Sequence, residues 1–141
     1  MSNTAGKIMT SAPPGAPLSP HLQIWRFTVT MAASITQRAT GIANFTGTAL
    51  IALWIFSVAQ GREFFAPVGA ILSSPIGMLI IFGYIWSLSF HMLGGLRYLY
   101  TDTGRGLDPA TAKSAAWATY IGSFVLTAVI AFAAWSARGG A

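Results

Sequence analysis

Residues 75–100 read PIGMLIIFGYIWSLSFHMLGGLRYLY, an apolar run that contains one histidine and, close to its end, one arginine. A helix needs about 20 predominantly apolar residues to cross about 30 Å of hydrocarbon, and this run is longer than that. Ser73 and Ser74, placed just before Pro75, are typical of a helix N-cap followed by proline in the first turn. The run therefore predicts a transmembrane helix.

Two further apolar runs, at about 28–59 and about 112–137, also exceed the spanning length. The segment between the first two runs contains two phenylalanines and a proline and is interpreted as a short interfacial piece. Residues 1–27 precede the first run and are rich in glycine, proline and serine up to residue 20, which predicts an extended cytoplasmic segment. The predicted fold class is an all-α membrane protein, with three transmembrane helices within a domain at 28–141.

The composition agrees with a bilayer protein. Of 141 residues, 54% are hydrophobic and only 8% are charged, against about 25% charged in soluble domains. The eight lysines and arginines are too scattered for a nucleic-acid surface. The chain has no cysteine, which excludes disulfides, iron–sulfur ligation by this chain and thioether-linked haem.

The cations predict the orientation and the membrane. Only Arg62 and Arg138 lie toward one side, whereas six cations lie around the N-terminus and the second loop, namely Lys7, Arg26, Arg38, Arg97, Arg105 and Lys113. The positive-inside rule then puts the N-terminus and that loop in the cytoplasm. The first 25 residues have no apolar signal core and no Arg-rich transit pattern, so a bacterial inner membrane is favoured over the mitochondrial inner membrane.

Two ionisable residues lie inside predicted spans. Arg38 is roughly ten residues into the first helix and His91 about six residues before Arg97 in the second, so each is about 9–15 Å from the cytoplasmic end of its helix. Because consecutive helices are antiparallel, both can occupy the same depth. Ionisable groups at such a depth are costly and predict a functional site.

The neighbours of these residues suggest what the site holds. Ser34, Arg38 and Gly41 share one helix face, and a second stripe consists of His91, Gly95, Tyr98 and Asp102. An imidazole is a common haem ligand, and a glycine near it leaves room for a flat macrocycle. A guanidinium can neutralise a haem propionate or donate hydrogen bonds to a carbonyl oxygen, as a serine hydroxyl also can.

Each of these residues also has a purely structural interpretation. His91 can hydrogen-bond across a helix pair, and Arg38 can extend its charged end to the interface. Ser34 and the two glycines after His91 can serve close helix packing. Tyr98 can be a headgroup anchor and Asp102 a solvated carboxylate at the helix end.

Two motifs carry a resemblance to a known family. Residues 17–25 (PLSPHLQIW) followed by residues 34–41 (SITQRATG) form the first motif, and residues 91–102 (HMLGGLRYLYTD) form the second. In order and spacing, together with the three-helix pattern, the chain resembles the cytochrome b subunit of succinate dehydrogenase, respiratory complex II. The resemblance covers nearly the whole chain.

The resemblance implies roles for individual residues. It implies that His91 is an axial ligand of the haem b iron, and that Ser34 and Arg38 line a ubiquinone pocket with Arg38 also near the haem propionates. It places Asp102 near the quinone end of the subunit and residues 18–22 near an iron–sulfur subunit.

The family usually has histidine at the positions of Gln37 and Tyr98. Both residues keep hydrogen-bond donors for a propionate but cannot carry positive charge, which affects the expected haem potential.

The resemblance also implies partners. If the haem has two imidazole ligands, His91 is the one membrane-embedded histidine of this sequence, so the second comes from another chain. The expected partners are a second small membrane anchor, an iron–sulfur subunit and a flavoprotein, which carry the iron–sulfur clusters and FAD. The chain itself would have no independent activity but would serve succinate:ubiquinone oxidoreduction.

Two alternatives remain open from the sequence, and a third is disfavoured. A fumarate reductase anchor differs in quinone preference, and a cofactor-free structural anchor would use the same glycines without haem. A channel or transporter would require polar stripes on several helices, whereas the third run has few polar residues.

Overall fold

The computed structural model describes residues 25–139, apart from the side chain of Arg138. Within this part of the chain there are four helices: α1 (Val29–Ala59), α2 (Arg62–Ser73), α3 (Pro75–Asp102) and α4 (Pro109–Gly139). Most of the expected extended segment 1–27, including residues 18–22 with the expected iron–sulfur-subunit contact, lies outside the described residues.

Side-chain caps determine where the three long helices begin. The Thr28 hydroxyl accepts the backbone N–H of Met31 at the start of α1 (3.4 Å). At the start of α3, the Ser74 hydroxyl accepts the N–H of Gly77 (3.1 Å), and Pro75 occupies the first turn. Such caps satisfy N–H groups that have no partner within the helix.

Three of the described helices, α1, α3 and α4, are long and apolar enough to cross a membrane. This confirms the expected all-α membrane fold with three spanning helices. The third begins at Pro109 rather than near residue 112, because the Asp108 carboxylate accepts the N–H of Thr111 (2.9 Å) and caps an additional turn. The segment interpreted as interfacial forms α2, which contains Pro67 and buries none of its residues.

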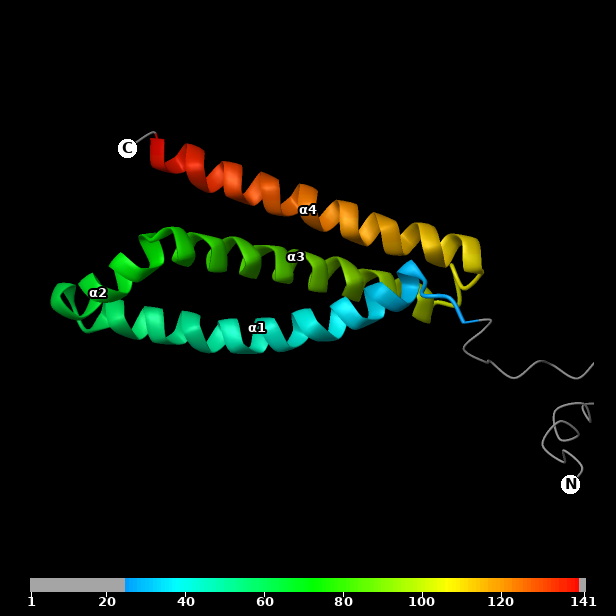
Figure 1. Cartoon of the computed structure of the whole chain (residues 1–141), viewed down its shortest axis with the longest axis horizontal. Helices are drawn as coiled ribbons and strands as arrows, with labels where there is room; N and C mark the ends of the chain where they lie inside the picture. Colours follow the sequence, from blue (N-terminus) through cyan, green and yellow to red (C-terminus); the bar gives the residue numbers. More distant parts are fainter. Residues whose placement is uncertain (1–24, 140–141) are drawn as a thin grey trace, which may run out of the picture.

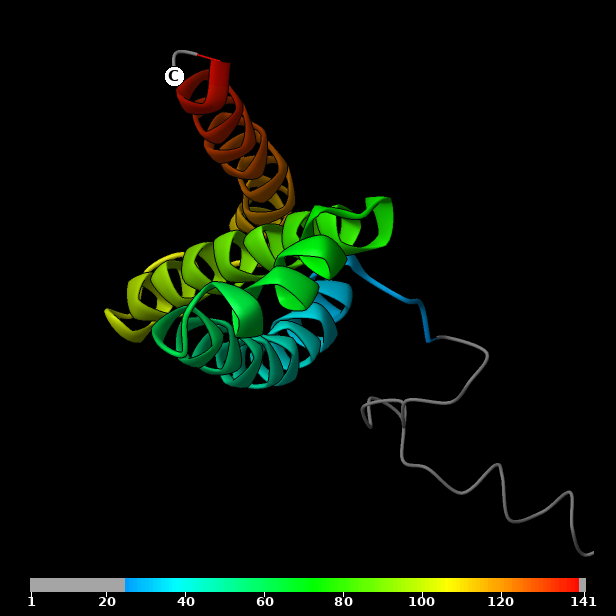
Figure 2. The same ribbon diagram turned by 90° about the vertical axis from the view of Figure 1, so that its left-hand side faces the viewer.

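Helices α1 and α3 run antiparallel and are joined at one end by α2 (Figure 1). Helix α4 packs on α3 and, less extensively, on α1. Figure 2 shows that α4 leaves the α1–α3 pair toward its C-terminal end. The best-packed region is therefore the end of the bundle at which α1 and α4 begin and α3 ends.

The packed interior at that end combines small and aromatic residues. Ala33, Phe90 and Ala116 form its buried core, one from each long helix. The Phe90 ring lies 4.8 Å from that of Tyr120, whose hydroxyl forms a 2.7 Å hydrogen bond with Thr36. This bond joins α4 directly to α1, one residue before Gln37.

Candidate functional site between α1 and α3

His91 lies between α1 and α3, where it is partly buried. Its Nδ1 is 3.2 Å from the backbone carbonyl oxygen of Gln37 and 3.3 Å from the hydroxyl of Thr40. A carbonyl oxygen can only accept, so Nδ1 carries the hydrogen and donates it. In the neutral ring the lone pair is then on Nε2, the atom that can bind a metal.

Backbone space at Gly41 permits this approach. A Cβ atom at position 41 would lie 3.3 Å from Cε1 of His91, a tighter contact than side chains normally make. The glycine that the sequence places on the same face as Ser34 and Arg38 therefore contacts the histidine directly. These contacts place the two predicted ionisable residues, on α1 and α3, at one level of the antiparallel pair.

Gln37 fills the space beside Gly94. Its Nε2 donates to the backbone carbonyl of His91 (3.1 Å), and its Oε1 is buried with no hydrogen-bond partner among the described residues. A Cβ atom at position 94 would collide with that Oε1. The amide is thus used for helix contact, and a propionate contact by Gln37 stays a prediction.

Gly95 differs from its neighbour. A Cβ atom at position 95 would meet nothing within 4 Å, so this side of α3 faces open space one turn beyond His91. Nε2 of His91 has no hydrogen bond among the described residues, and the open space at Gly95 leaves room on the same helix for a flat macrocycle bound by a histidine. The residues present therefore fit a haem.

Ser34 and Arg38 lie on α1 beside these contacts. Ser34 is partly buried and Arg38 is exposed, and no hydrogen bond among the described residues involves the Arg38 guanidinium. Arg38 directly follows Gln37, whose carbonyl oxygen accepts from His91, so the backbone of Arg38 lies at the level of the imidazole. An exposed cation there is available to an anionic or carbonyl-bearing partner.

Tyr98 and Asp102 lie further along α3. Tyr98 is 41% exposed, and the Arg97 guanidinium carbon lies 5.1 Å from the centre of its ring, a cation–π arrangement. Asp102 is the last residue of α3 and is exposed. The propionate contact of Tyr98 and the quinone contact of Asp102 stay predictions.

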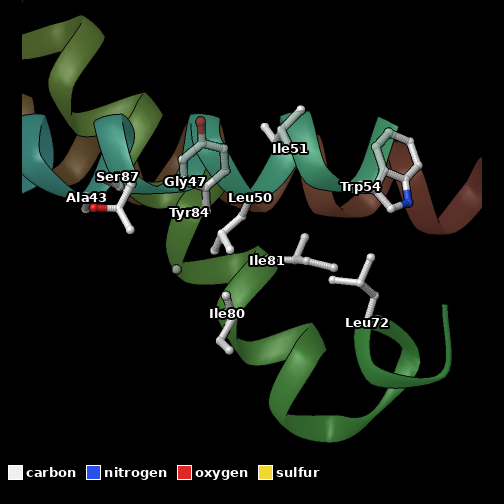
Figure 3. Close-up of a pocket in the computed structure, with 12 residues that line it drawn as sticks. Ala43, Gly47, Leu50, Ile51, Trp54, Leu72, Ile80, Ile81, Tyr84 and Ser87 are labelled. Carbon is white, nitrogen blue, oxygen red and sulfur yellow. The ribbon is translucent and has the colours of Figure 1, made fainter. Parts of the chain in front are cut away.

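A cavity of about 540 Å³ lies elsewhere, between α1 and α3 near α2. None of the predicted site residues lines it. Figure 3 shows its apolar walls, which are formed mainly by Leu50, Ile51, Trp54, Leu72, Ile80 and Ile81. The predicted site residues therefore lie outside this cavity.

The sequence motifs did not indicate a role for Thr40, the contact of Gly41 with His91 or the Tyr120–Thr36 bond. A signal for Thr40 exists: Gln37, Thr40 and Asn44 recur at helical spacing and oppose Ser87 and His91 on α3. The Ser87 hydroxyl indeed donates to Asn44 Oδ1 (2.8 Å) and lies 3.2 Å from the Thr40 carbonyl. Small polar residues are common in membrane helices, so the pattern alone is weak.

Fold and site together define a three-span membrane protein with an open histidine site at a helix pair. The model of the succinate dehydrogenase/fumarate reductase transmembrane subunit family matches residues 13–130. The chain therefore belongs to that family, as the two motifs predicted.

The chain is similar to the succinate dehydrogenase cytochrome b556 subunit of Paracoccus denitrificans, with 38% identity over 110 residues, 78% of this chain and 85% of the relative. It is 25% identical to the Rickettsia felis b556 subunit over 114 residues, 81% of this chain and 89% of the relative. The mitochondrial b560 subunit of Sus scrofa is 36% identical over 95 residues, 64% of this chain, which spans only 55% of that longer relative.

Proposed function

We propose that this chain is the membrane anchor and haem b subunit of a succinate:ubiquinone oxidoreductase. The observation that carries the proposal is the hydrogen-bonding of His91, whose Nδ1 donates to α1 and whose Nε2 has no hydrogen bond among the described residues, with open space at Gly95 one turn further along α3. The matched relatives, named as cytochrome b subunits of succinate dehydrogenase, support the same assignment.

The purely structural interpretation of His91, a hydrogen bond across the helix pair, accounts for the contact of Nδ1 only. A histidine that only cross-links two helices needs one nitrogen for the bond, and the Gln37 carbonyl provides that partner. Metal-ligating histidines also donate their second nitrogen to a carbonyl, which fixes the ring's orientation and tautomer. Nε2 of His91 would then bind the haem iron, and haem b, when bound, would supply a one-electron carrier.

Arg38 and Ser34 are proposed to bind ubiquinone. A guanidinium donates hydrogen bonds to a carbonyl oxygen and stabilises negative charge that develops on it during reduction. Arg38 is exposed at the level of His91, and partly buried Ser34 lies one turn away on the same face. Together they can orient the quinone head group and favour its protonation. Arg38, Gln37 and Tyr98 are further proposed near the haem propionates, and Asp102 near the quinone.

The open site implies a second chain. His91 is the histidine that the described spans offer, so a second imidazole would come from another small anchor packed against the α1–α3 face. An iron–sulfur subunit and a flavoprotein, carrying the clusters and FAD, would then deliver electrons from succinate. This chain would bind and orient the haem and the quinone and tune their electrostatic surroundings, and succinate would be oxidised on the flavoprotein.

The proposed location is a bacterial inner membrane. Arg26, Arg97, Arg105 and Lys113 lie at the bundle end where α1 begins and α3 ends, whereas Arg62 lies on α2 at the opposite end (Figure 1). The positive-inside rule puts the first end in the cytoplasm.

The test is a reduced-minus-oxidised spectrum of the intact purified complex, with and without succinate. A b-type band should appear, and replacing His91 by Leu should abolish nearly all of it because iron loses an axial ligand. Tyr84→Phe, a control on the same helix, removes a hydroxyl far from the site and should leave the band intact. A His91→Leu complex with an unchanged band would refute ligation by this residue.

A further inference from the structure

Thr40 contacts His91 from α1 although no predicted role falls on it. Its side chain is 3% exposed, and its hydroxyl oxygen lies 3.3 Å from Nδ1 of His91. The same oxygen lies 2.9 Å from the carbonyl oxygen of Thr36 and 3.0 Å from that of Gln37. The hydroxyl is therefore placed between its own helix backbone and the imidazole.

The direction of each bond follows from what each group can donate. Both carbonyl oxygens can only accept, so the Thr40 hydroxyl hydrogen points to one of them. Nδ1 carries a hydrogen because it faces the Gln37 carbonyl. The remaining lone pairs of the Thr40 oxygen can then only accept from Nδ1–H. Two acceptors, one backbone and one side-chain, thus share the imidazole hydrogen.

The surrounding contacts hold this hydroxyl in place. Back-bonding to the preceding turn restricts the threonine side chain, which is already stiff because it is branched at Cβ. Ser87, one turn before His91 on α3, lies 3.2 Å from the Thr40 carbonyl, and Gly41 lets the ring lie against α1. Contacts from α1 and α3 together therefore hold the Thr40 hydroxyl in place.

We infer that Thr40 is a positioning residue for His91 that holds the ring in the Nδ1–H tautomer and tunes its donor strength. The inference rests on the proposed function, because it concerns the iron that His91 would bind through Nε2. An acceptor on Nδ1–H makes an imidazole a stronger donor, which favours the oxidised iron. In a poorly solvated helix interface such a bond is stronger than in water.

Thr40→Val tests the inference, because valine keeps the shape of threonine and lacks the oxygen. The haem should remain, and its reduction equilibrium should shift toward the reduced form by up to about tenfold, which is the lower end of the loss of metal affinity on removing such a partner, applied to the oxidised iron alone. For a one-electron couple this is a rise in potential of at most about 59 mV. Redox titration of the b-type band in the intact complex measures it.

Two further variants distinguish the loss of the Thr40 hydroxyl from a general disturbance of the fold. Thr40→Ser keeps the oxygen and should retain the wild-type potential. Thr119→Val removes a threonine on α4 that is similarly buried, 5% exposed, and bonded only to its own helix at Ala115 (2.9 Å). It should also leave the potential unchanged. If valine at position 40 prevents assembly, Thr40→Ala and the serine variant carry the same test.

The outcomes distinguish this inference from the proposed function. If His91→Leu abolishes the band and Thr40→Val leaves the potential unshifted, the role of Thr40 is refuted and ligation stands. A serine variant shifted as far as the valine variant would also overturn the inference. If His91→Leu keeps the band, the proposed ligation fails first, and a shift in Thr40→Val would then have to arise by another route.

Discussion

In the half of the molecule around His91, side-chain hydrogen bonds join α1 to α3, whereas in the half around α2 the same two helices enclose an apolar cavity. The His91 half comprises residues 29–44, 87–102 and 109–123, and the α2 half comprises residues 45–86. In the first, the Gln37 amide, the His91 ring and the Ser87 hydroxyl all reach the opposite helix. In the second, the Tyr84 ring lies against Gly47, with its hydroxyl 3.5 Å from that of Thr48.

The difference shows what determines the partner and the register of two helices in a membrane. Lipid is as apolar as leucine, so apolar contact alone does not select one partner or register, and interhelical hydrogen bonds contribute about 0.6–2 kcal/mol each. The His91 half has such bonds and a tight register. The α2 half has few, and α4 has departed from it (Figure 2). A precise cofactor site needs the first kind of packing.

The comparison predicts its largest effect at Arg38, in the His91 half. Arg38→Leu in the intact complex should lower quinone reduction by about 10²-fold, the typical loss when a donor to developing charge is removed. Succinate oxidation by a soluble dye acceptor should be unaffected, because the dye takes electrons before the membrane. The matched control is Arg62→Leu, an exposed arginine of the α2 half, which should leave both rates unchanged.

Two results would contradict the assignment of Arg38 to quinone reduction. Equal loss of the quinone and dye activities in Arg38→Leu would mean that assembly, and not quinone binding, has failed. A comparable loss in Arg62→Leu would mean that the two halves do not differ in this respect. Arg38→Lys keeps the charge without the planar pair of donors and should fall between wild type and leucine.

A smaller effect is expected at two glycines of α3. Gly94→Ala should displace the Gln37 amide and break its bond to the His91 carbonyl, which costs about 1 kcal/mol. Gly83→Ala lies in the α2 half, where an added Cβ meets nothing within 4 Å, and should be neutral or slightly stabilising because alanine favours helix. Thermal unfolding of the purified complex compares them.

A double-mutant cycle sharpens that result. With Gln37→Ala already present, Gly94→Ala should cost less, because the group with which the new methyl collides has been removed. Additive losses would show that the Gly94 effect arises from another contact. Equal losses at Gly83 and Gly94 would remove the proposed difference between the halves.

Much of the α1–α3 pair could be predicted from sequence, because its evidence is local and periodic. The length of the apolar run, the Ser74–Pro75 start and the antiparallel placement of Arg38 and His91 all follow from spacing and bilayer thickness. The family could also be predicted, because two motifs in order are specific. Those inferences need no knowledge of which side chain faces which.

The pairing of individual side chains could not be predicted. The family pattern predicts a propionate contact for Gln37, which stays a prediction, but gives no indication that its amide donates to the His91 carbonyl and packs on Gly94. Thr40 could not be singled out, because the hydroxyl of a threonine in an apolar helix usually bonds only to a carbonyl of the preceding turn. Rotation of α1 about its axis by a fraction of a turn decides both cases, and apolar residues on every face leave that rotation unspecified.

The smallest expected effect concerns the caps at the two ends of the bundle. The pKa of Asp108 is lowered below its usual value, chiefly because its carboxylate accepts the backbone N–H of Thr111 and secondly because of the Thr111 hydroxyl. A lowered native pKa means that the cap stabilises the start of α4 above the unfolded pKa of about 3.9. This stabilisation is lost as the pH falls through the lower native value.

Asp108→Ala should therefore reduce the thermal stability of the complex slightly at pH 7, and the difference from wild type should vanish in strong acid. Ser74→Ala removes the cap of α3 at the α2 end, where the accepting hydroxyl does not titrate in this range. Its effect should be the same at both pH values if the complex remains assembled. A pH-dependent loss in Ser74→Ala, or a pH-independent one in Asp108→Ala, would show that ionisation of Asp108 does not distinguish the two ends. The cap at the His91 end would then act through its geometry alone, since a neutral carboxyl oxygen can still accept the Thr111 N–H.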